Sequence, residues 1–521
     1  MTATKGKILW VDDEVELLRP HIRFLTDKGY AVDVATNGED AVEILKAQAF
    51  DLVFLDEMMA GMGGLRTLAE IKDLRPEVPV VMITKSEDEG LMENAIGGKI
   101  SDYLTKPVNP SQVLLACKKF LEGKKITGEH VSRDYLKEFN QISGKLQMGP
   151  DVGEWIRIYD KLVLWSRELD QHPELGFKQT MIDQFRECNV EFSKFIERNY
   201  RNWLEQASRP TLSVDVVEHY LIPELDGTSS VFFFVIDCLR LDQWRVMEEN
   251  LKEFFTITTD FYISILPTAT PYSRNAIFSG AWPNEIEVRF PEIWEAWEDD
   301  DNSRNRNERQ FLDNLLQRRK IQLKPEPKYV KIIDAEFGRG IEQNILTYAQ
   351  NKLTSVVVNF VDMLAHGRSD SEILKEIAPD ESAYRSLTGS WFQHSSLFGM
   401  LKTLSQQKSV KIILTTDHGS IRCLHGAKVL GDRQASTSLR YKFGRNLKCD
   451  ERQAIFVKNP SDFRLPKRGV TVNYIIAKED YFFVYPTDYH KYLNHYRDSF
   501  QHGGISMEEM ILPVAKLVPK S

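Results

Sequence analysis

The stretch VFFFVIDCLRLDQW, residues 231–244, decides the fold of the second half of this chain. Its first six residues are apolar and favour β-structure, as in strands that are buried on both faces of a parallel sheet. Asp237 follows this run directly, and open α/β sheets bind their ligands at the carboxyl ends of their parallel strands. The stretch therefore predicts a central parallel strand that ends in a carboxylate at a functional edge.

Two further apolar runs end in an aspartate, SVVVNFV before Asp362 and VKIILTT before Asp417. His366 follows Asp362 by four positions, and His418 comes directly after Asp417. One aspartate after a strand is usually a helix cap or a turn former. Three of them at one sheet edge, two with a histidine, instead indicate a metal site. Mixed carboxylate and imidazole ligands suit zinc, and two such ions can lie side by side.

The composition is that of a soluble globular protein with several domains, because the 521 residues are 42% hydrophobic and 27% charged. The net charge of -9 gives no sign of a whole-chain nucleic-acid binder. The sequence opens without a signal-peptide pattern, and no apolar run approaches the roughly 20 residues of a membrane helix. The five cysteines are scattered and odd in number. We therefore expect reduced thiols, a cytoplasmic protein and no membrane insertion.

Residues 1–122 alternate apolar strands with helices, which predicts a doubly wound parallel α/β sheet. Asp12 and Asp13 follow the first strand, and Asp56 ends the third. These carboxylates share one edge of the predicted sheet. Oxygen ligands of this kind predict one bound Mg²⁺.

Thr84 and Lys106 end the next two strands, and a hydroxyl and an ammonium suit phosphoryl oxygens. The whole pattern resembles the flavodoxin-like receiver domain of two-component response regulators. The resemblance implies that Asp56 accepts a phosphoryl group from a sensor histidine kinase. It also implies that Lys106 binds this group and that Thr84 and Tyr103 are the switch residues. A cis peptide bond at Lys106-Pro107 is a further implication.

Residues 123–222 show helical periodicity. Apolar side chains recur every three or four positions over residues 155–169 and again over residues 181–203. This pattern predicts an all-α connector of two to four helices in which the aromatic residues form the packing core. We expect the connector to pass the state of the N-terminal module onward.

The third segment, residues 223–521, contains a candidate nucleophile. Thr270 before Pro271 predicts a helix N-cap, with the helix ending near Gly280. A hydroxyl at a helix N-terminus lies where phosphate binds, and a neighbouring metal lowers its pKa. Thr268 is the fallback nucleophile. His502, before a Gly-Gly turn, supplies a third imidazole.

The order Asp, Thr, Asp-x-x-x-His, Asp-His and His-Gly-Gly resembles the alkaline phosphatase superfamily, and in particular its phosphodiesterase branch. The resemblance implies an α/β domain with two Zn²⁺ ions and a Thr270 nucleophile that passes through a phosphothreonine. It assigns one ion to Asp237, Thr270, Asp417 and His418. It assigns the other ion to Asp362, His366 and His502.

The whole arrangement resembles the PorX-type response regulators with a PglZ domain, a family associated with the type IX secretion system. The resemblance implies a zinc phosphodiesterase that acts on oligonucleotides under the control of Asp56 phosphorylation. It also implies a homodimer on phosphorylation. The implied partners include an extracytoplasmic-function sigma factor and components of the secretion machinery.

Two insertions interrupt the third segment. Residues 292–309, which include Glu298-Asp299-Asp300-Asp301, are predicted to be a solvated loop or helix face. The second insertion, between His418 and His502, contains a basic run near Tyr441 and Phe443. This run either lies along an oligonucleotide backbone or is ordinary charged surface. Its members are Arg433, Arg440, Lys442, Arg445 and Lys448.

Two other functions remain open. The enzyme alternative is a phosphomonoesterase or a phosphomutase. A monoesterase would need an arginine on the terminal phosphate, and Arg274 is the nearest candidate. A mutase would need a base or acid pair for phosphoryl return, which the sequence does not reveal. A non-catalytic alternative is a zinc-stabilised docking module for a sigma factor or a secretion component. No helix-turn-helix signature is visible, so direct DNA binding is not expected. Four histidines match no part of the site pattern and are expected on the surface or in the core, namely His394, His425, His490 and His495.

Overall fold

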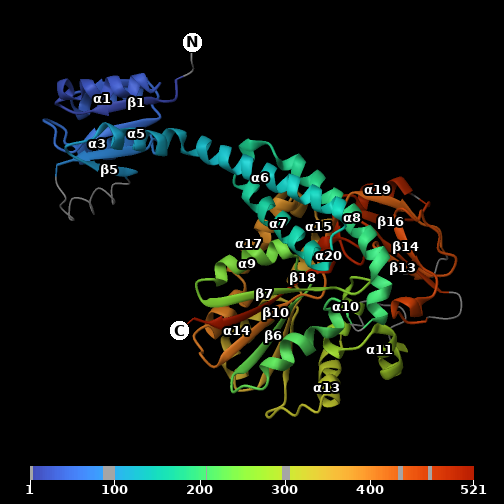
Figure 1. Cartoon of the computed structure of the whole chain (residues 1–521). Coiled ribbons are helices and arrows are strands. Elements are labelled where there is room, and N and C mark those ends of the chain that lie inside the picture. Colours follow the sequence, from blue (N-terminus) through green and yellow to red (C-terminus); the bar gives the residue numbers. More distant parts are fainter. Residues whose placement is uncertain are drawn as a thin grey trace. The chain divides into compact units, whose positions relative to one another are not determined.

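The computed structural model describes residues 4–85, 100–206, 208–295, 306–431, 438–467, 472–487 and 489–520. The chain forms two compact units, Met1–Glu138 and Phe139–Ser521. Figure 1 shows the helices and strands of both units along the chain.

The first unit contains a five-stranded parallel sheet in the order β2-β1-β3-β4-β5. Alternate side chains of β1 enter two apolar clusters, with Leu9 in one and Trp10 in the other, so the sheet is covered on both faces. The predicted doubly wound sheet is confirmed. Its strands are β1 Lys7–Val11, β2 Ala31–Ala35, β3 Leu52–Asp56, β4 Val80–Thr84 and β5 Asp102–Thr105. Its helices are α1 Val15–Asp27, α2 Gly38–Ala47, α3 Gly64–Leu74 and α5 Pro110–Cys117.

Three long helices follow, α6 Gly123–Met148, α7 Val152–Asp170 and α8 Lys178–Glu205. The two apolar periodicities of the sequence correspond to α7 and α8, as predicted. The aromatic residues pack between these helices, because the rings of Trp155 and Phe192 lie 5.3 Å apart. Asp151 caps α7 by accepting a hydrogen bond from the backbone N–H of Glu154 at 2.7 Å.

The second unit is built on a six-stranded sheet in the order β7-β18-β10-β6-β9-β8. Strands β10, β6, β9 and β8 are parallel, whereas β18 is antiparallel to both of its neighbours. The three apolar runs of the sequence form the adjacent strands β10, β6 and β9, so their carboxyl ends share one edge. The strands are β6 Ser230–Ile236, β7 Phe255–Ile263, β8 Lys328–Ile332, β9 Leu353–Val358, β10 Val410–Thr415 and β18 Ile511–Pro519.

Helices connect these strands. The ring of Phe233 on β6 packs against Phe278 of α10 at 5.8 Å between ring centroids. The larger helices are α9 Leu241–Leu251, α10 Thr270–Ser279, α13 Glu308–Arg318, α14 Ala335–Tyr348, α15 Phe360–Asp370, α17 Glu381–Gln393 and α18 Ser396–Leu404. The shorter ones are α11 Pro283–Arg289, α12 Pro291–Glu295, α16 Glu372–Ile377 and α20 Met507–Met510. No helix in the described part of the chain is long and apolar enough to cross a membrane.

The structure corrects two predicted boundaries. Strand β9 ends at Val358, and residues 360–361 begin α15, so that Asp362 and His366 lie one helical turn apart. A buried first turn has the same apolar sequence as a strand end, because Val361 is fully buried. Thr270 is the first residue of α10, and Ala269 in extended conformation takes the N-cap position. Helix α10 ends at Ser279, and Gly280 caps it in the left-handed conformation, close to the predicted end.

The described residues of the insertion between His418 and His502 form three small sheets, an α-helix and a 3-10 turn at Pro460–Phe463. Strand β11 Ile421–Cys423 pairs with β17 Ser499–Gln501, and β12 His425–Lys428 pairs with β16 Tyr481–Val484. The third sheet has the order β13-β15-β14, with β13 Tyr441–Gly444, β14 Ala454–Val457 and β15 Asn473–Ala477. The helix is α19 Tyr489–Tyr496.

The basic run in this insertion does not form one exposed face. Arg440 and Lys442 are buried, whereas Arg445 and Lys448 are exposed. Burial lowers the pKa of Lys442 to about 8. Arg433 lies outside the described residues, as do Glu298-Asp299-Asp300-Asp301 of the first insertion.

Candidate active site

Three predicted ligands of the second unit meet at the sheet edge. Asp237 follows β6, and Asp417 and His418 follow β10. Each of these buried residues offers a ligand atom, and the three atoms lie within 4.8 Å of one another. The Nε2 atom of His418 lies 3.8 Å from Oδ1 of Asp237 and 3.7 Å from Oδ2 of Asp417. This spacing suits three ligands of one cation.

The backbone around His418 orients its imidazole. Its Nδ1 atom lies 3.1 Å from the carbonyl oxygen of Gly419, which assigns the ring proton to Nδ1 and leaves the Nε2 lone pair for the site. Only glycine fits at position 419, because a Cβ atom there would lie 2.0 Å from the carbonyl oxygen of Glu508. Cys238, in the turn after Asp237, has a φ of 63°, in the left-handed region.

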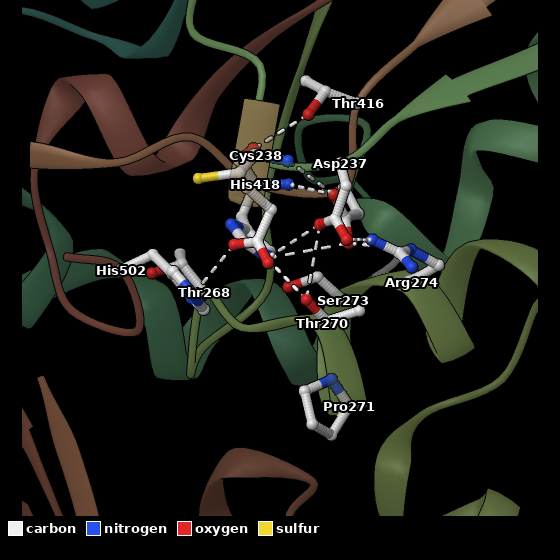
Figure 2. Close-up of polar contacts among 12 residues, drawn as sticks. Asp237, Cys238, Thr268, Thr270, Pro271, Ser273, Arg274, Thr416, His418 and His502 are labelled. Atoms are coloured by element: carbon white, nitrogen blue, oxygen red, sulfur yellow. Dashed lines mark hydrogen bonds and ion pairs between the residues drawn. The ribbon is translucent and has the colours of Figure 1, made fainter. Parts of the chain in front are cut away.

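The Thr270 hydroxyl points into this cluster. Figure 2 shows its Oγ1 atom directed at His418 and Asp237, at 3.0 Å from Nε2 of His418 and 3.4 Å from Oδ1 of Asp237. The other threonine considered as a nucleophile has a different task. Thr268 donates to the carbonyl oxygen of Gly504 at 2.8 Å and accepts from the N–H of Gly503 at 3.1 Å. Thr268 therefore holds the loop that follows His502.

The remaining three ligand candidates form a second cluster. The ligand atoms of Asp362, His366 and His502 also lie within 4.8 Å of one another. The Oδ1 atom of Asp362 lies 3.4 Å from Nε2 of His366 and 3.5 Å from Nε2 of His502. The rings of His418 and His502 stack with centroids 4.2 Å apart, so the two clusters are immediate neighbours.

Both clusters fit cations. Burial raises the pKa of Asp237 to about 7 against the effect of Arg274, and the nearby Asp417 raises it further. Burial lowers the pKa of His502 well below its ordinary value, with a further contribution from His418, so its imidazole is neutral and offers a lone pair. Among the described residues, the buried Oδ1 atom of Asp362 has no hydrogen-bond partner. A metal ion would compensate this oxygen.

Arg274 lies behind the first cluster, which corrects its proposed role as a ligand of a terminal phosphate. Its side chain is fully buried, and it forms an ion pair with Asp237 (Figure 2) and a second with Asp417 at 3.0 Å. Its Nη1 atom also lies 3.8 Å from Oε1 of Glu308. Glu308 is fully buried, although the sequence places it in a stretch expected to be solvated. No local sequence signal distinguishes it from its exposed neighbours.

Another buried ion pair supports the second cluster. Arg440 of the basic run binds Glu509 through Nη2 at 2.6 Å, and both side chains are fully buried. Glu509 also accepts a hydrogen bond from the N–H of Gly504 at 2.8 Å. Arg440 therefore stabilises the loop after His502 and is not available to an oligonucleotide. Sequence reasoning missed this role because the two residues are 69 positions apart.

The first unit brings its predicted acidic residues together as well. The ligand atoms of Asp12, Asp13 and Asp56 lie within 4.8 Å of one another. Burial raises the pKa of Asp56, and Asp12 and Asp13 add to this effect. The Lys106 ammonium lies 3.0 Å from both Asp12 and Asp56. This acidic cluster fits one divalent cation.

The two predicted switch residues of the first unit differ in burial. Thr84 is buried and donates a hydrogen bond to Glu57, whereas Tyr103 is 45% exposed. The Lys106-Pro107 peptide bond is cis, as expected. Elsewhere, the four histidines outside the site pattern, His394, His425, His490 and His495, are all exposed.

The sequence matches three known families in succession. Residues 8–118 match the response regulator receiver domain, and residues 125–204 match the PorX response regulator linker domain. Residues 216–517, more than half of the chain, match the BREX system PglZ alkaline phosphatase-like domain. The chain belongs to the PorX-type response regulators. A PorX-type chain receives its signal from a sensor kinase through its receiver domain. Receiver domains and alkaline phosphatase-like domains generally use metal ions.

Two curated relatives are similar to about a quarter of this PorX-type chain. The alginate biosynthesis regulator AlgB of Pseudomonas aeruginosa is 37% identical over 24% of this chain and 27% of its own length. The regulator ZraR of Klebsiella oxytoca is 30% identical over 27% of this chain and 32% of its own length. The chain thus spans about a third or less of these relatives.

Solved receiver structures show a similar pattern of coverage. The chemotaxis protein CheY4 of Vibrio cholerae is 24% identical, with a TM-score of 0.22, and covers 22% of this chain and 98% of its own. A response regulator of Clostridium difficile is 28% identical, with a TM-score of 0.22, and covers 22% of this chain and 95% of its own.

Proposed function

We propose that phosphorylation of Asp56 controls a di-zinc phosphodiesterase in the second unit, which cleaves oligonucleotides with Thr270 as its nucleophile. The observation that carries this proposal is the Thr270 hydroxyl, 3.0 Å from Nε2 of His418 and beside two adjacent clusters that fit cations. In the proposed assignment, Asp237, Asp417 and His418 hold one Zn²⁺ together with Thr270. Asp362, His366 and His502 hold the other Zn²⁺.

Bound zinc would supply a lowered hydroxyl pKa and compensation for the charge on the phosphoryl oxygens. The chain itself provides the nucleophile and its orientation. Thr270 Oγ forms a bond to phosphorus while the bond between phosphorus and the leaving alcohol oxygen breaks, and the hydroxyl proton ends on that alcohol. Water then hydrolyses the phosphothreonine and restores the Thr270 hydroxyl. Because Thr270 begins α10, the positive end of the helix dipole lies beside the proposed phosphoryl site.

The state of Arg274 favours a diester over a monoester substrate. A monoester carries one more negative charge, which the monoesterase alternative neutralises with this arginine. Arg274 is fully buried and bound to Asp237, Asp417 and Glu308, so its guanidinium is already compensated. We still propose an oligonucleotide as the diester substrate. Arg440 and Lys442 do not support this choice, because both side chains are buried.

The proposed organisation is a receiver over residues 1–122, a helical connector over residues 123–222 and the catalytic domain over residues 223–521. Asp12, Asp13 and Asp56 hold one Mg²⁺, Lys106 binds the phosphoryl group, and Thr84 and Tyr103 respond to it. We further propose that phosphorylation produces a homodimer. The partners in this proposal are an extracytoplasmic-function sigma factor and components of type IX secretion.

The decisive experiment compares the wild type with Thr270→Ala and Thr270→Ser, all loaded with zinc. The substrates are bis(p-nitrophenyl) phosphate, p-nitrophenyl phosphate and a short oligonucleotide. We expect Thr270→Ala to lose at least about 100-fold in diester turnover, because no nucleophile remains. Thr270→Ser should keep most of the activity, because it retains the hydroxyl.

Zinc content and circular dichroism serve as controls for each variant, and Thr268→Ala serves as the comparison for a loop effect. Equal diester turnover by Thr270→Ala and the wild type would exclude Thr270 as the nucleophile. If the zinc-loaded wild type turns over none of the three substrates, the non-catalytic docking module becomes the better explanation.

A further inference from the structure

The second unit contains a cavity of about 510 Å³ apart from the proposed metal site. Helices α7 and α8 form one wall, and α9, α17 and the first strand of the insertion contribute to the other. The lining includes neither Thr270 nor any of the six proposed zinc ligands. A volume of this size is typical of sites for small molecules.

One side of the cavity is apolar. Val163 and Leu169 of α7 and Met181, Ile182 and Phe185 of α8 line it. Leu169 and Met181 are buried, whereas Ile182 is 37% exposed. This wall suits a hydrocarbon body, because its burial removes apolar surface from water.

The other side carries an ionic cluster with an excess of acid, in which Arg240, Asp242 and Arg385 are buried. Arg240 binds Asp242 through Nε at 2.9 Å and Glu381 through Nη2 at 2.5 Å. Arg385 binds Asp242 at 2.8 Å and also pairs with Asp170. Two guanidinium groups thus face three carboxylates in this part of the lining.

A further acid, Glu508, lines the same cavity, and the structure gives it only amide partners. The amide nitrogen of Asn189 donates to Oε1 and Oε2 of Glu508 at 3.2 Å and 2.9 Å. Burial raises the pKa of Glu508 to about 7, and the amide of Asn189 and the charge of Arg240 only partly oppose this effect. The Nη1 atom of Arg240 is buried and has no hydrogen-bond partner among the described residues. Glu508 can therefore bind a cation, and Arg240 can donate a hydrogen bond to an acceptor in the cavity.

The other cationic side chains of the lining, those of Lys178, Arg186 and Arg422, each already lie beside a further acid. Lys178 binds Asp380 at 2.6 Å, and Arg186 lies 3.8 Å from Asp480. Arg422 pairs with Asp498, which lies outside the lining.

We propose that this cavity binds a small amphiphile with a hydrocarbon body and a cationic amine head that carries a neighbouring hydroxyl. The hydrocarbon lies against α7 and α8. The ammonium pairs with Glu508 and Glu381. The hydroxyl oxygen accepts a hydrogen bond from Nη1 of Arg240, which has no acceptor among the described residues. Charge complementarity favours this class over fatty acids, whose carboxylates would add to the acidic excess.

The test uses the full chain and three probes with the same alkyl chain, N-decylethanolamine, 1-decanol and decanoate. Isothermal titration below the aggregation concentration of each probe gives its affinity and stoichiometry. We expect one saturable site for N-decylethanolamine, with a Kd at least about tenfold lower than those of the other two probes. Binding does not depend on turnover, so this result is independent of the proposed phosphodiesterase activity.

Two variants and one control locate the site. Ile182→Trp narrows the cavity and should weaken amine binding at least about tenfold. Glu508→Gln should remove most of the preference for the amine over the alcohol. Leu164→Trp adds the same ring on the exposed side of α7, outside the lining, and should leave binding unchanged.

Three results would each overturn the proposal. These are the absence of saturable amine binding, equal affinity for the three head groups, and unchanged binding by Ile182→Trp. Melting temperature and circular dichroism verify that each variant is folded.

Discussion

Asp237 and Asp417 share a single buried guanidinium, that of Arg274, whose other neighbour is Glu308. Buried carboxylates without a cation are strongly unfavourable, so Arg274 stabilises the metal-free protein at this point. A zinc ion in the proposed position would add positive charge next to the same carboxylates. The arginine and the metal are therefore expected to be partly interchangeable in their effect on stability.

Replacement of Arg274 by glutamine tests this relation. In metal-free protein, Arg274→Gln should lower the free energy of unfolding by about 3 kcal/mol, because it leaves buried charge unpaired. Excess zinc should recover a substantial part of this loss, because the ion binds only the folded site. Denaturant titrations with and without zinc measure both values.

The control is Arg289→Gln, which removes an exposed ion pair with Glu285. It should lower the free energy of unfolding by less than about 1 kcal/mol. An equal loss with and without zinc would contradict the prediction.

Glu508 makes stability depend on pH. Its pKa is raised from 4.5 to about 7 in the folded protein, so the folded state holds this proton more tightly than the unfolded chain. Its contribution is complete below about pH 4.5 and is lost as the pH rises towards 7. Glu508→Gln cannot ionise and lacks this dependence. The unfolding free energy of the wild type relative to the variant should fall by about 3 kcal/mol from pH 4.5 to pH 8.

Denaturant titrations of both proteins across this pH range provide the comparison. The exposed Glu187 on the same helix as Asn189 supplies the control substitution, Glu187→Gln. Parallel pH profiles for the wild type and Glu508→Gln would show that the Glu508 carboxyl has no raised pKa.

At the scale of whole elements, helix α8 contacts both loops of the candidate active site. Near its N-terminal half, the Asn189 side chain accepts a hydrogen bond from the N–H of Met507 at 2.8 Å, at the start of α20. Farther along, the Tyr200 hydroxyl accepts one from the N–H of Leu266 at 2.8 Å, four residues before Thr270. The helix thus supports the nucleophile loop and the segment after His502.

Tyr200→Phe should separate this support from simple packing, because the ring remains. The buried N–H of Leu266 would lose its acceptor, at a cost of about 1–2 kcal/mol in unfolding free energy. If Thr270 is the nucleophile, kcat for a diester should fall more than KM changes, because the loop is less well positioned and binding is retained. Tyr220→Phe removes a hydroxyl that binds Asp260 and is the matched control. Wild-type kcat in Tyr200→Phe would contradict this role of α8.

Two features, the apolar run 355–361 and the basic run of the insertion, show the limit of predictions from local sequence patterns. The run 355–361 predicted one strand, but its last residues begin α15, since a buried helical turn and a strand end are equally apolar. The basic run of the insertion predicted either a surface or a nucleic-acid groove. In the folded unit Arg440 pairs with Glu509, a partner that no local pattern indicates.

For the molecule as a whole, the proposed signal is the phosphorylation of Asp56. Beryllium fluoride with Mg²⁺ mimics the phosphoryl group. It brings negative charge and new hydrogen-bond acceptors next to Lys106 and Thr84. We therefore expect it to convert the chain from monomer to dimer at micromolar concentration. Sedimentation velocity measures the two states. Asp56→Asn should remain monomeric under the same conditions, whereas the exposed Asp27→Asn should dimerise like the wild type. Dimerisation of Asp56→Asn on addition of the mimic would exclude this site as the trigger.

The sequence alone determined which residues could form the sites, because strand ends, Asp-x-x-x-His, Asp-His and His-Gly-Gly are local patterns whose chemistry follows from residue type and spacing. It likewise determined the receiver sheet and the helices of the connector, which follow from local periodicity. Only the tertiary structure decided which partners compensate the buried charged and polar groups around these sites. Arg274 with Glu308, Arg440 with Glu509, Tyr200 with Leu266 and the acid-rich cavity depend on contacts between residues far apart in the chain. The burial of an ionisable group and the charge of its partner together determine its protonation state. Both depend on the folded structure and not on the local sequence.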